Sequence, residues 1–183
     1  MKRLMVFLNS KLCVGCHACE TACKMENAVP AGPKWINVRS VNLQQVLGRW
    51  QIISRPIRCV HCSSKSPCER VCPVKAIKRT DDGIVTVDTP KCVGCKLCLL
   101  LCPFCVPAFN AHHQMTKCDF CYERLKRGVK PACVQACPMN ALSFENASSL
   151  ATKLRNSYIK KRLTYEIEDG REIVEWRSHG FIG

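Results

Sequence analysis

The chain has 183 residues, a formal net charge of +14, and 17 cysteines. This length can bury one ordinary core or two small ones, so the cysteines must serve a disulfide framework, a basic nucleic-acid module or metal binding. A secreted disulfide framework is disfavoured, because the apolar run of residues 4–8 is too short for a signal peptide and no A-x-A-like cleavage site precedes Cys13.

Sixteen of the cysteines form four successive quartets. The first and third have the spacing C-x2-C-x2-C-x3-C, and proline follows each of the last three. Three thiolates within seven residues can wrap one cubane cluster while the fourth reaches a second cluster, as in bacterial two-cluster ferredoxins. The chain is therefore predicted to bind four [4Fe-4S] clusters through its quartets: Cys13, Cys16, Cys19, Cys23; Cys59, Cys62, Cys68, Cys72; Cys92, Cys95, Cys98, Cys102; and Cys118, Cys121, Cys133, Cys137.

The clusters change the meaning of the positive charge. Each oxidised cluster with four thiolates contributes about −2, so four of them reduce +14 to about +6. This weakens the case for a nucleic-acid partner, and none is predicted. Clusters would also replace much of a conventional core, so we expect the protein without iron to be largely unfolded.

In chain order, residues 1–29 hold the first quartet, and residues 30–54 form an inserted extended segment. The insertion begins with the turn-forming Pro30 to Pro33 and contains two extended candidates, 35–41 and 49–54, which suggest a hairpin laid over the first module or against a partner. Residues 55–109 then combine the second quartet, a turn at Asp82-Gly83, an alternating strand at 84–87 and the third quartet. This is the layout of a bacterial two-cluster ferredoxin.

The first and fourth quartets lie on either side of this central module. We predict that residues 1–29 and 110–145 fold together as a second, discontinuous ferredoxin-like module. The predicted ligand sets are Cys59, Cys62, Cys68 and Cys102; Cys92, Cys95, Cys98 and Cys72; Cys13, Cys16, Cys19 and Cys137; and Cys118, Cys121, Cys133 and Cys23. The rival connectivity, which pairs quartet one with two and three with four, remains open. The predicted fold class is α+β, two nested ferredoxin-like modules with a cluster-dominated core.

Two further segments are not explained by cluster binding. The interval YERLKRGVKPA, residues 122–132, is predicted as a basic loop, either solvated or used for docking. In the tail, residues 146–183, Asn146 or Ser148 can cap a helix to about Arg162, and 164–168 and 171–176 are predicted as a hairpin. We expect this helix and hairpin extension to contact a partner or a second copy.

Several single residues have competing interpretations. Zinc is disfavoured because structural zinc sites draw two pairs from separated knuckles. Cys98, Cys102 and Cys105 have the spacing of radical enzymes that cleave adenosylmethionine, but the chain is too short for their barrel, so Cys105 is predicted as a small buried residue. We interpret His17, His61, His112 and His113 as ordinary loop or surface residues, whereas Lys96 and Lys117 could either tune clusters or be solvated.

These stretches resemble the four-cluster iron-sulfur subunits of the dimethyl sulfoxide reductase type. They look closest to the small cytoplasmic polyferredoxin subunits that accompany formate dehydrogenases, hydrogenases, carbon monoxide dehydrogenases and tungsten aldehyde oxidoreductases. The resemblance covers most of residues 11–144 and is carried by CVGCHACETAC, CVHCSSKSPCERVCPVKAI, CVGCKLCLLLCPF and KCDFCYERLKRGVKPACVQACP. It implies two ferredoxin-like modules with clusters in a line, and ligand exchange between quartets one and four and between two and three.

The resemblance also implies a partner, a catalytic subunit holding molybdenum, tungsten, nickel or iron. Two features of this chain affect what the resemblance implies. Lys24 stands where the other quartets have proline, so a helix can continue past Cys23. All sixteen ligand positions are cysteine, which predicts four [4Fe-4S] clusters and no three-iron cluster. The stretch 97–109 contains Pro103 and Pro107 and is not expected to span a membrane.

The predicted function is non-catalytic, because no phosphate loop or substrate pocket is visible in the sequence. We predict a cytoplasmic electron-transfer subunit that relays single electrons between the catalytic subunit and another redox partner or further copies of itself. One alternative is a polyferredoxin whose tail assembles copies into a conducting filament. A zinc-binding nucleic-acid module is the remote alternative.

Overall fold

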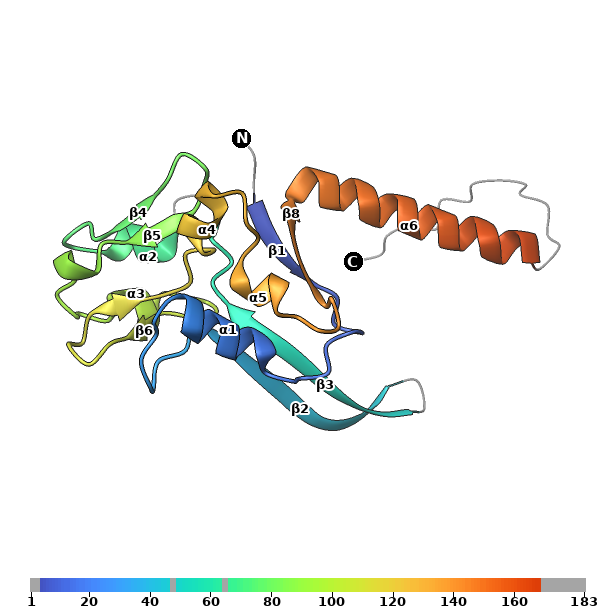
Figure 1. Cartoon of the computed structure of the whole chain (residues 1–183), viewed down its shortest axis with the longest axis horizontal. Helices are drawn as coiled ribbons and strands as arrows, with labels where there is room; N and C mark the ends of the chain where they lie inside the picture. Colours follow the sequence, from blue (N-terminus) through green and yellow to red (C-terminus); the bar gives the residue numbers. More distant parts are fainter. Residues whose placement is uncertain (1–3, 47–48, 64–65, 169–183) are drawn as a thin grey trace. The chain divides into compact units, whose positions relative to one another are not determined.

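The structure is a computed structural model, and it describes residues 4–46, 49–63 and 66–168. Contacts divide the chain into two units, Met1–Ala147 and Ser148–Gly183. Within the described residues of the first unit, all strands form two-stranded antiparallel sheets joined by short helices and loops (Figure 1). Sheets of this size are marginally stable alone, so their stability depends on what packs between them.

The sheet nearest the two ends of the first unit joins distant parts of the chain. Strand β1 (Leu4–Leu8) pairs with β8 (Leu142–Asn146), with Val6 opposite Phe144. Helix α1 (Ala18–Glu26) packs against α5 (Ala132–Gln135) in the same region. These contacts bring the first and fourth quartets together. The helix also continues three residues past Cys23, as the lysine at position 24 predicts.

The inserted segment forms the predicted hairpin, with longer strands than the sequence suggested. Strand β2 (Ile36–Val46) pairs with β3 (Arg49–Arg58), and the register shifts between Val41 and Gln44. The base of the hairpin is buried, with Ile36 only 1% exposed.

A buried carboxylate ties this hairpin to α1. Glu20 accepts hydrogen bonds from the Val38 amide and from Lys34 Nζ, the latter at 2.8 Å. Burial acts to raise the pKa of Glu20, but these hydrogen bonds outweigh it and the pKa lies below its ordinary value. The charged carboxylate therefore fixes α1 to β2.

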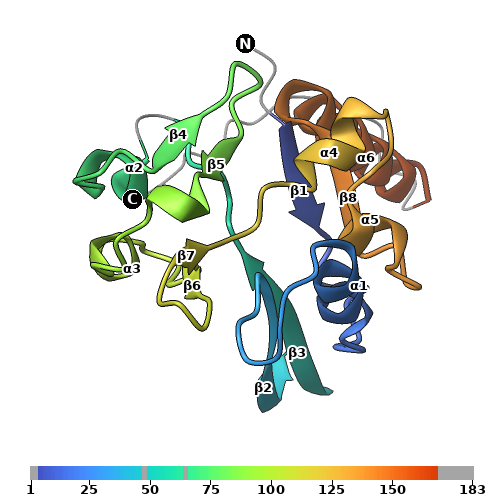
Figure 2. The same ribbon diagram turned by 60° about the vertical axis from the view of Figure 1, so that its left-hand side comes forward.

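The central part of the chain has two smaller sheets and two short helices. Strand β4 (Ile77–Arg79) pairs with β5 (Val85–Val87) across the predicted Asp82-Gly83 turn, and β6 (Ala108–Phe109) pairs with β7 (Met115–Thr116). Helices α2 (Pro67–Val71) and α3 (Leu97–Leu100) lie against one another, and a 3-10 turn covers Thr89–Lys91. Figure 2 shows these elements on one side, and β1, β8, α1 and α5 on the other.

The buried core is rich in thiols. Its larger cluster has twelve buried residues, and five are cysteines: Cys19, Cys23, Cys59, Cys118 and Cys133. Val6, Ile36 and Ile84 belong to the same cluster, whereas Ile77, Val85, Cys98 and Met115 form a smaller one.

Two predictions about secondary structure were wrong. The basic interval 122–132 was predicted as a loop, but it begins with helix α4 (Tyr122–Lys126). Gly128, at φ +71°, ends this helix in a Schellman motif, in which the Gly128 amide donates to the Leu125 carbonyl and the Val129 amide to that of Arg124. A short helix closed by glycine satisfies backbone groups that an open loop would leave to water.

The second correction concerns the tail. Helix α6 runs over Ala147–Glu168, so residues 164–168 are helical and do not form the first strand of a hairpin. The predicted second strand, 171–176, lies outside the described residues. A helix already nucleated adds further turns at little cost, and Leu163, Glu166 and Glu168 are good helix formers with no proline or glycine before Gly170.

Candidate metal centres

The cysteines of the four quartets surround four cavities. Cavity 1 is lined by Cys13, Cys16, Cys19 and Cys137; cavity 2 by Cys59, Cys62, Cys68 and Cys102; cavity 3 by Cys72, Cys92, Cys95 and Cys98; and cavity 4 by Cys23, Cys118, Cys121 and Cys133. The space at each of the four cavities, including the part that opens to solvent, is similar at about 290 to 400 Å3. Each therefore combines three cysteines of one quartet with the last cysteine of another. None of the four combines quartet one with two, or three with four.

Short helices explain how the fourth cysteine reaches a different cavity. The third cysteine of every quartet lies on a helix, and the fourth follows four residues later. On α1, Cys23 lies about 6 Å further along the helix axis than Cys19. In the other quartets the fourth cysteine lies at or just beyond the end of the helix, and in every quartet it lines a different cavity from the third. The third cysteines are Cys19 on α1, Cys68 on α2, Cys98 on α3 and Cys133 on α5.

The loops before these helices share an unusual backbone. The residue preceding the second cysteine has a positive φ in all four quartets: Gly15 at +69°, His61 at +48°, Gly94 at +70° and Phe120 at +58°. This left-handed residue turns the loop around the cavity, so the first and second cysteines face the same space. Quartets two and four make this turn with large side chains, which then pack between the cavities.

Burial suppresses ionisation of the thiols. It raises the pKa of Cys19, Cys98 and Cys133 to about 11 and that of Cys23 to about 12. The pKa of the fully buried Cys118 is also raised. Thiolates are the ligands for iron, so loading these cavities with metal must release protons.

Several N–H groups already point at the cysteine sulfurs. In cavity 3, the Met115 amide donates to Cys92 Sγ at 3.2 Å and the Ala76 amide to Cys72 Sγ at 3.3 Å. In cavity 4, Asn27 Nδ2 lies 3.7 Å from Cys23 Sγ. Donors placed in this way favour a negatively charged sulfur.

Three buried N–H groups have no partner among the described residues. They are Trp35 Nε1, Arg58 Nε and His61 Nε2. Trp35 and Arg58 line cavity 4, and His61 lines cavity 2. An unpaired buried donor costs about 1–3 kcal/mol. Donors of this kind at the cavity walls fit a cluster, whose sulfur atoms accept hydrogen bonds.

His61 lies in a loop, as predicted, but it is not a surface histidine. Its side chain is buried with 4% of its surface exposed, and its ring lies 3.8 Å from that of Phe120. Nδ1 accepts a hydrogen bond from the Val85 amide at 3.0 Å. Burial, aided by the charges of Lys117 and Arg58, lowers the pKa of His61 to about 2, so the ring is neutral and Nε2 carries its hydrogen. By contrast, His17, His112 and His113 are exposed.

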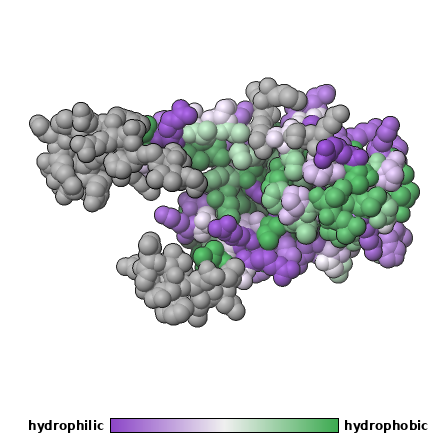
Figure 3. All heavy atoms as spheres, turned by 180° about the vertical axis from the view of Figure 1, so that it is seen from behind, coloured by the Kyte–Doolittle hydropathy of each residue, from purple (hydrophilic) through white to green (hydrophobic). Residues whose placement is uncertain are grey.

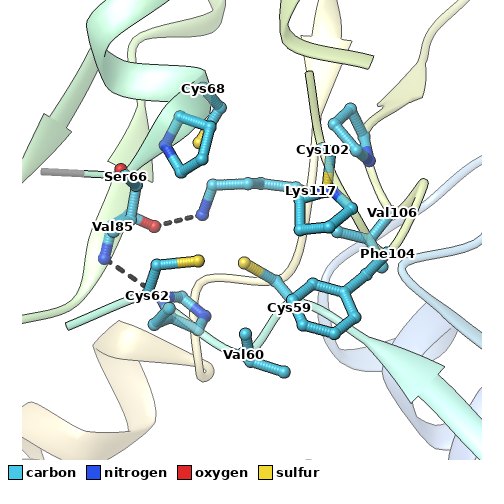
Figure 4. A pocket seen from close by; sticks show the side chains of 14 residues that line it. Cys59, Val60, Cys62, Ser66, Cys68, Val85, Cys102, Phe104, Val106 and Lys117 are labelled. Carbon is cyan, nitrogen blue, oxygen red and sulfur yellow. Dashed lines mark hydrogen bonds between the residues drawn. The ribbon is translucent and has the colours of Figure 1, made fainter. Parts of the chain in front are cut away.

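The two lysines singled out in the sequence have different environments. Lys96 is exposed, with Nζ 6.0 Å from the centre of the Phe109 ring. Lys117 is only 4% exposed and lines cavity 2, where it donates to the carbonyl oxygens of Val85 and, at 3.0 Å, Cys118. Figure 4 shows its side chain lying among the labelled cysteines of this cavity, with Nζ directed at Val85.

The prediction that Cys105 is buried was also wrong. Cys105 is exposed, at φ +48°, because its amide closes a turn onto the Cys102 carbonyl at 3.1 Å. Cys98 and Cys102 line different cavities and Cys105 lines none of the four, so the three do not share a site. This is not the arrangement that the radical-enzyme spacing would require.

The cavities also differ from a site for a single ion. In the part of the chain that the structure describes, no three His, Cys, Asp or Glu side chains are grouped to hold one metal ion. Each set of four thiols surrounds a space instead of meeting at a point. This arrangement suits a polynuclear cluster, in which every thiolate binds a different iron.

Sequence comparison identifies the family. Residues 49–147, more than half of the chain, match the model for the 4Fe-4S dicluster domain. The protein belongs to this family. It is 38% identical to one of the chains of the anaerobic dimethyl sulfoxide reductase of Escherichia coli over 159 residues, which covers 80% of this chain and 75% of the relative. It is also 40% identical to the thiosulfate reductase electron transfer subunit PhsB of Salmonella typhi, with coverages of 74% and 72%.

An archaeal relative shows that the resemblance extends over more of the chain. The putative dimethyl sulfoxide reductase iron-sulfur subunit of Halobacterium salinarum is 31% identical and covers 88% of this chain and 72% of its own length. Together with the sixteen quartet cysteines, this membership assigns four [4Fe-4S] clusters as the cofactors and electron transfer, not catalysis, as the function. Among the described residues, no helix has the length and apolar character needed to cross a membrane.

Proposed function

We propose that this protein is a cytoplasmic relay that passes single electrons between a catalytic reductase subunit and a second redox partner. One cluster is held in each of the four cavities. The proposed ligands are Cys13, Cys16, Cys19 and Cys137 in cavity 1; Cys59, Cys62, Cys68 and Cys102 in cavity 2; Cys92, Cys95, Cys98 and Cys72 in cavity 3; and Cys118, Cys121, Cys133 and Cys23 in cavity 4.

The observation that carries this proposal is the composition of the cavity walls. Four thiols line each cavity, and three of them always come from one quartet. A protein that only needed small metal sites would gain nothing from sharing cysteines between quartets. Sharing places two cavities at the two ends of one short helix, so neighbouring clusters are held at a fixed spacing.

The same sharing supports two nested ferredoxin-like modules. Residues 55–109 contribute most of cavities 2 and 3, while residues 1–29 and 110–145 contribute most of cavities 1 and 4. Pairing of β1 with β8 and packing of α1 on α5 are the contacts expected if the outer segments form one module. The hairpin of β2 and β3 then lies beside the outer module through its contact with α1.

The protein's own contribution is to exclude water and to set the charge around each site. A bound [4Fe-4S] cluster supplies a one-electron couple whose potential depends on burial, hydrogen bonds to sulfur and nearby charge. In this chain the amides of Met115 and Ala76, Asn27, and the unpaired donors at Trp35 and His61 are placed to provide such hydrogen bonds.

A catalytic partner is proposed from the relatives and from the surface. The relatives are named as components of dimethyl sulfoxide, thiosulfate and tetrathionate reductases. Large apolar side chains are exposed around quartet three, at Val93, Leu97, Leu100, Leu101 and Phe104. Figure 3 shows a broad hydrophobic area on the side of the first unit that holds this quartet. An apolar area of this kind favours docking of another protein close to cavity 3.

The ligand exchange can be tested with three serine variants of the anaerobically purified protein. Cys72→Ser and Cys98→Ser should alter the same paramagnetic signal of the reduced protein, because both side chains line cavity 3. Cys68→Ser should alter a different signal, that of cavity 2. If each quartet held its own cluster, Cys68→Ser and Cys72→Ser would affect the same signal, and the proposed ligand sets would be wrong. Iron near sixteen atoms per wild-type chain, with matching sulfide, checks the cluster count.

A further inference from the structure

Two basic side chains, the buried Lys117 and the half-buried Arg58, lie where the chain passes between cavities 2 and 4. Arg58 lines cavity 4, although the next residue, Cys59, lines cavity 2. Lys117 lines cavity 2, although the next residue, Cys118, lines cavity 4. Each cavity therefore receives a positive side chain from the strand or loop that carries a ligand of the other. We call this reciprocal arrangement the cation junction.

Lys117 is shielded from solvent, and Arg58 is half-buried with its Nε atom enclosed. Lys117 Nζ is held by the carbonyl oxygens of Val85 and Cys118, and Arg58 donates through its terminal nitrogen to the Val6 carbonyl. The rings of His61 and Phe120 stack between the same two loops. Neutral carbonyl partners leave the positive charge of each cation uncompensated, since neither contact is with a carboxylate.

Two other basic residues next to quartet cysteines are exposed to solvent, and one of them is paired with a carboxylate. Lys96 lines cavity 3 but is exposed, and Lys91 is exposed and paired with Asp88 at 2.6 Å. Water and counterions screen charges of this kind, whereas a buried charge acts through a lower effective dielectric constant. A position beside a quartet cysteine is therefore not enough for a basic residue to influence a cluster. Burial distinguishes Lys117 from Lys96.

We propose that Lys117 and Arg58 raise the reduction potentials of the clusters in cavities 2 and 4, so that the cation junction favours residence of the electron there. This inference rests on the proposed ligand sets. When an electron crosses the junction, one cluster is oxidised by one electron and the other is reduced by one electron. No bond forms or breaks and no proton is transferred. The extra negative charge lies next to Lys117 on one side or Arg58 on the other, which stabilises the reduced form.

Potentiometric titration of the four paramagnetic signals tests the proposal. Lys117→Gln removes the charge but keeps an N–H donor for the Val85 carbonyl. It should lower the reduction potential of one cluster, the cluster in cavity 2 whose signal Cys68→Ser alters. The expected shift is about 59 mV, which for one electron lowers the ratio of reduced to oxidised cluster at a fixed potential about tenfold. Lys117→Arg should restore the wild-type value. Lys96→Gln is the matched control and should leave all four potentials nearly unchanged.

The outcomes separate this inference from the proposed function. If the wild-type protein holds four clusters and Lys117→Gln shifts no potential more than Lys96→Gln does, the inference is wrong while the function stands. If Lys117→Gln loses iron, Arg58→Gln and Arg58→Lys provide a second pair of variants. Their reduction potentials are compared for the cluster in cavity 4, whose signal Cys121→Ser alters. A lower potential with glutamine but not with lysine supports the proposal. Equal potentials in this pair overturn it.

Discussion

Replacing Gly94 with alanine tests the backbone of cavity 3 more sharply than changing a ligand would. Gly94 has a φ of +70°, and a Cβ at this position would lie 2.8 Å from the backbone oxygen of His113. The left-handed conformation costs alanine about 1–2 kcal/mol, and relieving contact with a backbone atom costs about 1–3 kcal/mol more. We therefore expect Gly94→Ala to destabilise the loaded protein by about 2–5 kcal/mol.

Gly83 supplies the matched control. It also has a positive φ, +81°, but nothing lies within 4 Å of where its Cβ would be. Gly83→Ala should therefore cost only about 1–2 kcal/mol, the part due to conformation. His61 and Phe120 show that the left-handed position itself accepts a large side chain where space exists. The difference between the two variants isolates the contact with His113.

The assay is the rate at which visible cluster absorption decays in urea containing an iron chelator, because cluster loss is irreversible and gives a rate, not an equilibrium. The contact energy of about 1–3 kcal/mol corresponds to roughly 5-fold to 150-fold faster decay for Gly94→Ala than for Gly83→Ala. Equal rates for the two variants would show that the approach of His113 does not constrain the loop, and the reasoning would be refuted.

Three further predictions concern packing, charge and the tail. Ile84→Ala removes a side chain that is 1% exposed and should cost up to about 2–5 kcal/mol, seen as faster cluster loss in the same urea assay, whereas Ile52→Ala, at 64% exposure, should change that rate by an amount equivalent to less than about 0.5 kcal/mol; equal rates would contradict the assigned core. Glu20→Gln weakens the buried link between α1 and β2 and should cost about 1–3 kcal/mol, while Glu123→Gln in an exposed pair should cost nothing measurable by the same assay. Deleting residues 148–183 should leave iron and sulfide per chain unchanged, because every cavity-lining residue precedes them; loss of iron would contradict this.

The features predicted well from sequence are those that local chemistry determines. Asp82-Gly83 forms the turn between β4 and β5 because glycine readily adopts a positive φ, here +81°. A hairpin was predicted from two extended candidates, 35–41 and 49–54, that follow the turn-forming Pro30 to Pro33, and β2 and β3 form it over a longer range. The grouping of sixteen cysteines into four sets followed from the spacing, which leaves only a few ways to share ligands between modules.

The features that sequence missed depend on tertiary surroundings. Lys91, Lys96 and Lys117 all lie next to quartet cysteines, and only the fold makes Lys117 buried. Arg58 was not singled out, although it precedes Cys59 as Lys117 precedes Cys118. Lys91 precedes Cys92 in the same way but is exposed, so the sequence pattern alone does not distinguish these residues. Cys105 was misjudged because cysteine is usually buried, whereas a local turn places this one outside.

The pairing of β1 with β8 has a consequence for how the protein is made. Residues 4–8 are synthesised early, yet their hydrogen-bonding partners, residues 142–146, emerge from the ribosome almost a full domain later. During that interval the N-terminal strand has an open edge, and the cysteines at 13–23 await four others beyond position 117. Cavities 2 and 3 take all eight of their cysteines from the central segment, so that segment can mature first and the outer segments close around it as translation ends.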